Sequence, residues 1–90
     1  MRILNREPVL VLIIEQIGEF TELFNSKELN KIVEKDMVKD YLDASDVASL
    51  AIELGRELEI KINNDVYQKW KTFEGVIDTC IHENNKKNNG

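Results

Sequence analysis

Residues 43–58, DASDVASLAIELGREL, carry the clearest helical pattern of this chain. Their apolar side chains recur at i, i+3, i+4, i+7 and i+11, a spacing that puts one face of a helix at Val47, Leu50, Ala51, Leu54 and Leu58. Asp43 stands three residues before Asp46, so its side chain can cap the first free N–H groups, and both carboxylates lie at the positive end of the helix dipole. The pattern predicts an amphipathic helix that begins directly after Asp43.

Two further apolar patterns flank this helix. Pro8 suits the first turn of a helix, and an apolar stripe follows it up to Gly18, at Val9, Leu10, Ile13, Ile14 and Ile17. The β-branched residues of this stripe also suit a strand, but no partner strand is evident elsewhere, so we expect a helix.

After residue 58 we expect a short helix within residues 65–70. Thr72 is a candidate cap for a last helix, whose apolar residues are Phe73, Val76, Ile77, Cys80 and Ile81.

The remaining segments complete a single domain. Residues 19–42 carry enough apolar side chains to lie on the bundle, and we expect a long connection with one or two short helical turns, the first capped by Ser26. Residues 84–90 have no apolar side chain and are expected to be a disordered polar tail. The sequence predicts an all-α domain over residues 1–83, with three main helices, one short third helix and a long first loop.

Length and charge exclude several classes of function. The chain has 90 residues, and a domain of this size buries roughly 60 to 65% of its unfolded surface, enough for a core but not for a deep substrate cavity. A self-sufficient enzyme is therefore not expected. Twelve Lys and Arg against seventeen Asp and Glu give a net charge of -5, which repels nucleic acid and anionic lipid and favours basic partners.

The sequence also predicts a cytoplasmic protein without a metal. The longest apolar stretch, Val9–Ile14, is far shorter than the roughly 20 residues of a membrane-spanning helix, and Glu7 before it disfavours an export signal. Cys80 has no second cysteine to pair with, and Cys80 with His82 does not make a zinc site. The acids between residues 36 and 46 lack the glycine and the spacing of a calcium loop.

The order of elements, with Asp43-Ala44-Ser45-Asp46 at the start of the second main helix, resembles the acyl carrier proteins. That family has Asp-Ser-Leu-Asp or a close variant there. It often has acid-x-x-Ile-Pro, Ile-x-Thr-Val and Val-Ile-Asp further on, where this chain has Glu59-Ile60-Lys61-Ile62, Trp70-Lys71-Thr72-Phe73 and Val76-Ile77-Asp78. The likeness spans residues 36–82 without a gap and implies a small four-helix bundle. Before it the agreement is one of pattern, and the loop is several residues longer than in typical fatty-acid carriers.

The resemblance implies a non-catalytic carrier that shuttles acyl or polyketide intermediates between enzymes of a type II polyketide or fatty-acid synthase. In the family, the motif serine bears a 4'-phosphopantetheine arm, and the acyl chain is a thioester on that arm. Ala44 stands in the place of the serine, flanked by Asp43, Ser45 and Asp46, and it has no hydroxyl to form the phosphodiester. Ser45 is a poor substitute because one helical step turns a side chain by about 100°.

Two explanations of Ala44 stay open. Either the natural protein has serine at position 44 and alanine replaced it to give a uniform unmodified form, or this chain is a natural relative that has lost the arm and works by contact alone. We favour the first, because the loss of one Oγ at an exposed helix start that Asp43 caps should cost little stability.

The resemblance also implies the partners and the surface that meets them. Carriers are monomers when free, and they dock on a phosphopantetheinyl transferase, a ketosynthase and other synthase enzymes through acids of the second helix that face basic surfaces. Three positions that are often glutamate in fatty-acid carriers are Ser49, Gly55 and Arg56 here, which favours dedicated partners of a specialised polyketide pathway. The matching docking residues are Asp43, Asp46, Val47, Ala48, Ile52, Glu53, Arg56 and Glu57.

In the family the acyl chain lies between the helices, and the matching positions are Leu50, Leu54, Ile62, Trp70, Val76 and Ile77. A purely structural role as core fits each of these residues equally well.

Two other classes of protein remain as alternatives. One is an arm-less helical adaptor or regulatory domain. The other is a helix-turn-helix DNA binder, which residues 47–55 resemble weakly and which the acidic charge disfavours.

Overall fold

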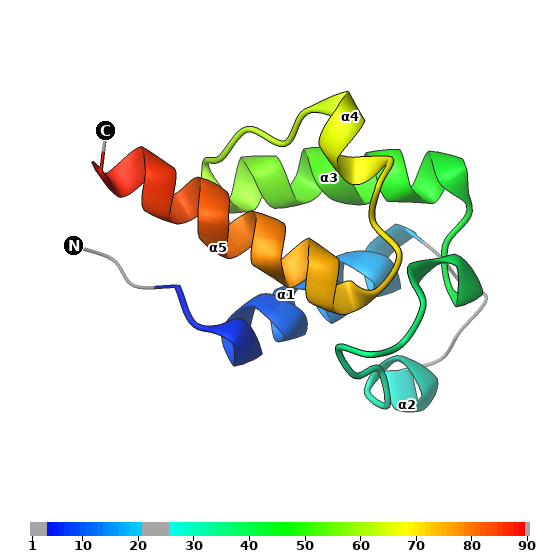
Figure 1. Cartoon of the computed structure of the whole chain (residues 1–90). Helices are drawn as coiled ribbons and strands as arrows, with labels where there is room; N and C mark the ends of the chain where they lie inside the picture. The colour runs from blue at the N-terminus through cyan, green and yellow to red at the C-terminus, as the bar shows by residue number, and fades with distance from the viewer. Residues whose placement is uncertain (1–3, 21–25, 90) are drawn as a thin grey trace.

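The computed structural model describes residues 4–20 and 26–89. Over these residues the fold is all-α, as predicted, and it contains no strand (Figure 1). Met37 and Thr72 form an isolated β-bridge. The helices are α1 (Arg6–Phe20), α2 (Ser26–Leu29), the 3-10 turn η1 (Val38–Asp40), α3 (Ala44–Leu58), α4 (Asn64–Tyr67) and α5 (Phe73–Asn89).

Helix α3 has the bounds that its apolar spacing predicts. Asp43 is the N-cap, and its Oδ1 accepts a hydrogen bond from the Asp46 N–H at 2.8 Å. At the other end Glu59 takes a left-handed conformation, with φ 54°, and its N–H donates to the carbonyl of Gly55. The Ile60 N–H donates to the same carbonyl at 3.0 Å, so the chain turns back closely over the last turn of the helix.

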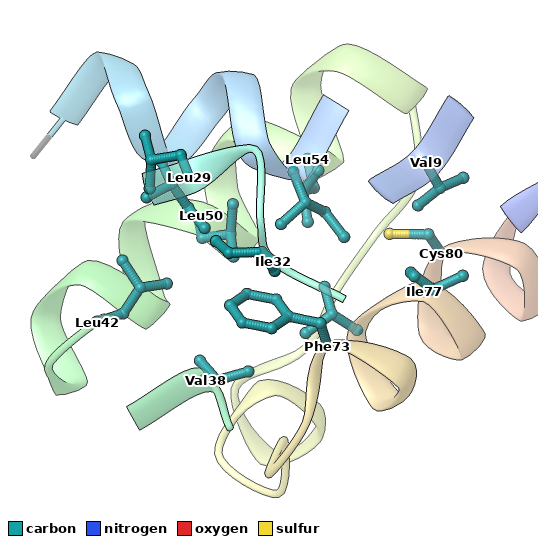
Figure 2. Close-up of a cluster of buried hydrophobic side chains, with 13 residues drawn as sticks. Val9, Leu29, Ile32, Val38, Leu42, Leu50, Leu54, Phe73, Ile77 and Cys80 are labelled. Atoms are coloured by element: carbon teal, nitrogen blue, oxygen red, sulfur yellow. The ribbon is translucent and has the colours of Figure 1, made fainter. Parts of the chain in front are cut away.

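The core lies where α1, α3 and α5 meet. Val9, Ile13 and Ile17 of α1 are buried, which confirms the preference for a helix over a strand in this segment. Figure 2 shows Phe73 among side chains from α3, α5 and the long connection, with Val9 beside Cys80. The buried hydrophobic residues of this cluster are Val9, Ile13, Ile17, Leu29, Ile32, Val38, Leu42, Leu50, Leu54, Phe73, Val76, Ile77 and Cys80.

The long connection carries short helical turns, as predicted, and it also holds the start of α5. Ser26 is the first residue of α2, and its predicted capping side chain lies outside the described residues. The carbonyls of Asp36 and Glu34 accept hydrogen bonds from the N–H groups of Phe73, at 3.1 Å, and Glu74, at 2.9 Å. The first N–H groups of α5 are therefore satisfied by backbone from a distant segment. Thr72, the predicted cap, stands directly before the helix, and its carbonyl accepts a hydrogen bond from the Gly75 N–H at 3.1 Å.

The prediction of a disordered tail from residue 84 is wrong for residues 84–89, because α5 continues to Asn89. Asn84 is buried, at 4% exposure, and the Lys87 ammonium donates to the carbonyl of Leu58 at 3.1 Å. The Lys87 hydrogen bond joins the last turns of α5 to the end of α3 although the segment has no apolar side chain. A lysine in the last turn of a helix also interacts favourably with the helix dipole.

No helix in the described part of the chain is long and apolar enough to cross a membrane.

Candidate functional site

The start of α3 is an exposed and firmly capped helix end. Ala44 and Ser45, its first two residues, are both exposed. The hydrogen bond from the Asp46 N–H is the main reason that the pKa of Asp43 lies below its ordinary value, and a hydrogen bond from the Ser45 side chain lowers it further. The side chain of Ala44 has no polar atom and takes no part in the cap.

A pocket of about 180 Å³ adjoins Ala44, between the first turns of α3 and the segment that contains α4. Ala44 and Val47 line it on one side, and Tyr67, Gln68 and Trp70 line it on the other. The indole N–H of Trp70 donates to the Thr79 hydroxyl at 2.9 Å, and that hydroxyl donates to the Gly75 carbonyl at 3.0 Å. This chain of hydrogen bonds anchors the Trp70 ring to α5.

Two aromatic rings form the far wall of this pocket. The ring centroids of Tyr67 and Trp70 are 6.3 Å apart, and the ring planes are inclined by 53°. Tyr67 and Gln68 were not among the predicted site residues. The aromatic pair at i, i+3 is the sequence signal that could have indicated a shared wall, but its position opposite Ala44 depends on how α4 packs on α3.

The eight predicted docking residues lie along α3 and its cap, and none of them is buried. Ile52 stands out because 61% of it is exposed, an unusual value for a large apolar side chain. Arg56 forms an ion pair with Glu53 at 3.3 Å, one helical turn away, so part of the acidic charge on this face is neutralised. The structure therefore brings an apolar side chain and acidic side chains together on one exposed face.

Of the six predicted cavity residues, only Trp70 lines the pocket beside Ala44. Leu50, Leu54, Val76 and Ile77 have 0% exposure and belong to the core cluster. Ile62, like Trp70, is partly buried and packs against that cluster. The structure thus places four of the six inside the packed interior, and the open pocket lies outside them.

The other chemically interesting side chains form no reactive group. Burial raises the pKa of the Cys80 thiol to about 12, so the thiolate that would act as a nucleophile is scarce at neutral pH. The His82 ring is exposed, with its Nε2 4.0 Å from a Glu83 carboxylate oxygen. Within residues 4–20 and 26–89, no three His, Cys, Asp or Glu side chains gather as metal ligands would.

The residues at the start of α3 do not fit a covalent phosphopantetheine group in this chain. Residue 44 is exposed at the first position of a capped helix, but its methyl group offers no oxygen for a phosphodiester. The neighbouring hydroxyl, that of Ser45, lies one helical step from residue 44, which turns its side chain by about 100°.

A scan against protein-family models, a search of curated proteins and a search of solved structures each found no match.

Proposed function

We propose that the chain is a carrier domain of the acyl-carrier type, in which residue 44 is the position of the arm and α3 is the docking helix. The observation that carries the proposal is the exposed start of α3, where Asp43 caps the helix and residue 44 adjoins an apolar pocket. In this interpretation α1, α3, α4 and α5 are the four helices of the bundle, and α2 and η1 belong to the long first loop.

Several physical features of the α3 start support an attachment role. Exposure of residue 44 lets a modifying enzyme reach it. Asp43 holds the helix end independently of the side chain at position 44. A serine there could be modified without loss of the cap.

The exposed face of α3 supports docking on basic enzyme surfaces. Asp43, Glu53 and Glu57 supply negative charge, and Ile52 supplies an apolar contact in the middle of the face. Charge complementarity of this kind gives rapid and salt-sensitive association. The Glu53–Arg56 pair makes the face less acidic, which fits dedicated partners, such as a ketosynthase of a type II polyketide pathway, better than general fatty-acid enzymes.

With alanine at residue 44, the chain would dock but not carry a covalent cargo. Ala44 is also the observation that favours the second candidate, an arm-less adaptor that uses the same face by contact alone. A DNA-binding role is disfavoured by α4, since a helix of four residues is too short for a recognition helix in the major groove.

The proposal is tested with Ala44→Ser, incubated with coenzyme A and a broad-specificity phosphopantetheinyl transferase. We expect the intact mass of this variant to rise by one phosphopantetheine, and the mass of the unchanged chain to stay constant. The matched control is Ala44→Ser combined with Ser45→Ala, which should still be modified. A constant mass in both serine-containing proteins would favour the arm-less adaptor.

A further inference from the structure

We infer that the pocket beside Ala44 accepts a neutral acyl group of about six carbons or one ring, and that this site does not hold a long alkyl chain in the helical core. The inference rests on the proposed function only for the acyl identity of the ligand and for the way in which it reaches the pocket. The pocket itself is present in the chain with alanine at position 44.

The size of the pocket sets the size of the ligand. Its volume is about 180 Å³. A cavity of about 150 Å³ lined by apolar side chains holds one benzene molecule. A single ring or a short chain therefore fills this pocket, whereas a longer chain extends beyond it.

The walls set the chemistry of the ligand. Val47, Tyr67 and Trp70 present apolar and aromatic surface, and the hydrogen bond of Trp70 to Thr79 fixes one ring in place. An aromatic or short aliphatic group can therefore make offset contacts with the rings. Gln68 is exposed at the pocket, and its side-chain amide supplies a donor for the carbonyl of a thioester.

The interior beyond the pocket is closed. Leu50 and Leu54 of α3, with Val76 and Ile77 of α5, have 0% exposure, so no water-sized void touches them. A long chain would have to displace these side chains from a close-packed core, which a short group does not require.

Charge selects a neutral group. Asp43 and Asp46 stand at the same end of α3 as the pocket, and the chain has a net charge of -5. A cargo with a free carboxylate would meet like charge at this place, and a thioester would not.

The fluorescence of Trp70, the only tryptophan of the chain, reports on the pocket directly. The unchanged chain is titrated with the benzoyl, hexanoyl and decanoyl thioesters of pantetheine. We expect saturable changes in fluorescence with the first two, and a dissociation constant at least about tenfold higher for the decanoyl thioester. Equal or tighter binding of the decanoyl thioester, or no saturable change with any of the three, would overturn the inference.

Variants separate the pocket from the rest of the surface. Val47→Phe fills the pocket and should weaken benzoyl binding at least about tenfold, whereas Val11→Phe, the same change at an exposed position of α1, should leave it unchanged. Tyr67→Ala removes a wall on the other side of the pocket and should also weaken binding. This second variant keeps the test valid if Val47→Phe misfolds. Unchanged binding in both pocket variants would contradict the proposed location.

The titration fails or succeeds independently of the proposed function, because it needs neither a serine at position 44 nor a transferase. If Ala44→Ser accepts the arm but the thioesters do not bind, only the inference about cargo falls. If the short thioesters bind but Ala44→Ser is not modified, only the carrier proposal falls.

Discussion

At the first turn of α3, two neighbouring residues differ in what they do. The carboxylate of Asp43 satisfies the Asp46 N–H, and this contact lowers the pKa of Asp43. Ala44 is exposed, lines the pocket and takes no part in the cap. The helix end is thus stabilised by one residue, and the next is left available for function, so position 44 can change without loss of the fold.

The lowered pKa of Asp43 predicts a pH dependence of stability. A carboxyl group whose pKa is lower in the folded state stabilises the fold above its unfolded pKa, and this contribution is lost as the pH falls through the folded value. In Asp43→Asn the side-chain oxygen can still cap, but the group no longer titrates. The midpoint of urea unfolding should therefore be higher for the unchanged chain above about pH 4, and the difference should shrink below it. A difference that does not vary with pH would contradict the role of the charged cap.

At the scale of the elements, the ends of the helices are held by segments that lie far away in the sequence. The start of α5 is bound by the carbonyls of Glu34 and Asp36, and Lys87 near its end binds the carbonyl of Leu58. The end of α3 folds back closely on Gly55. These contacts fix how α3, α4 and α5 lie around the pocket.

Gly55 is required by the close return of the chain at the end of α3. A Cβ at this position would lie 2.9 Å from the Ile60 carbonyl oxygen, so Gly55→Ala should destabilise the protein by about 1 to 3 kcal/mol despite the better helix propensity of alanine. Gly75→Ala is the matched control, because its Cβ would lie at an ordinary 3.8 Å from the Trp70 ring. It should leave stability equal or raise it by up to about 1 kcal/mol in urea unfolding. Equal losses in the two variants would count against the backbone contact.

The last turns of α5 should contribute to stability although they are entirely polar. Removal of residues 84–90 deletes the buried Asn84 and the Lys87 contact with Leu58. We expect the free energy of unfolding to fall by about 1 to 3 kcal/mol, with a smaller fall for Lys87→Ala. Calorimetry of the shortened chain checks this, and an unchanged melting temperature would mean that the segment behaves as a free tail.

At the scale of the whole molecule, the chain is a small all-α domain of net charge -5, and the exposed face of α3 is the docking surface that we propose. Arg6 joins α1 to the connection through Glu34 and to α5 through Asp78, so three distant segments are tied at the surface. Because such exposed ion pairs add little stability, the packed core carries the fold. The exposed side chains of the proposed docking face can therefore change without loss of the fold.

Docking through this face predicts a charge effect that depends on position. In the Ala44→Ser background, Glu57→Lys should slow modification by the transferase about tenfold or more at low salt, and added salt should reduce the difference between the variants. Glu7→Lys makes the same change of charge on exposed α1 and serves as the control. Equal effects of the two variants on the initial rate would show that net charge, and not the α3 face, governs the encounter.

The sequence predicts the parts of this fold that depend on local pattern. The bounds of α3 follow from apolar spacing and from the Asp43 cap, and the helical state of α1 follows from its apolar stripe. The extension of α5 was missed because residues 84–89 are polar, and their contacts with α3 are tertiary. Residue 44 could be singled out from the sequence because its motif is local. Tyr67 and Gln68 line the pocket only through the packing of α4 on α3, which the sequence pattern does not contain.

Ala44→Ser is treated with coenzyme A and the transferase, and the residue that bears the added group is identified. This location is the strongest test of the carrier proposal. Fragmentation of the modified protein in a mass spectrometer assigns the group to one residue. We predict phosphopantetheine on residue 44 and none on Ser45, because residue 44 is exposed and lines the pocket, whereas Ser45 does not line it. A group found on Ser45, or no group on either residue, would contradict the assignment of residue 44 as the arm position.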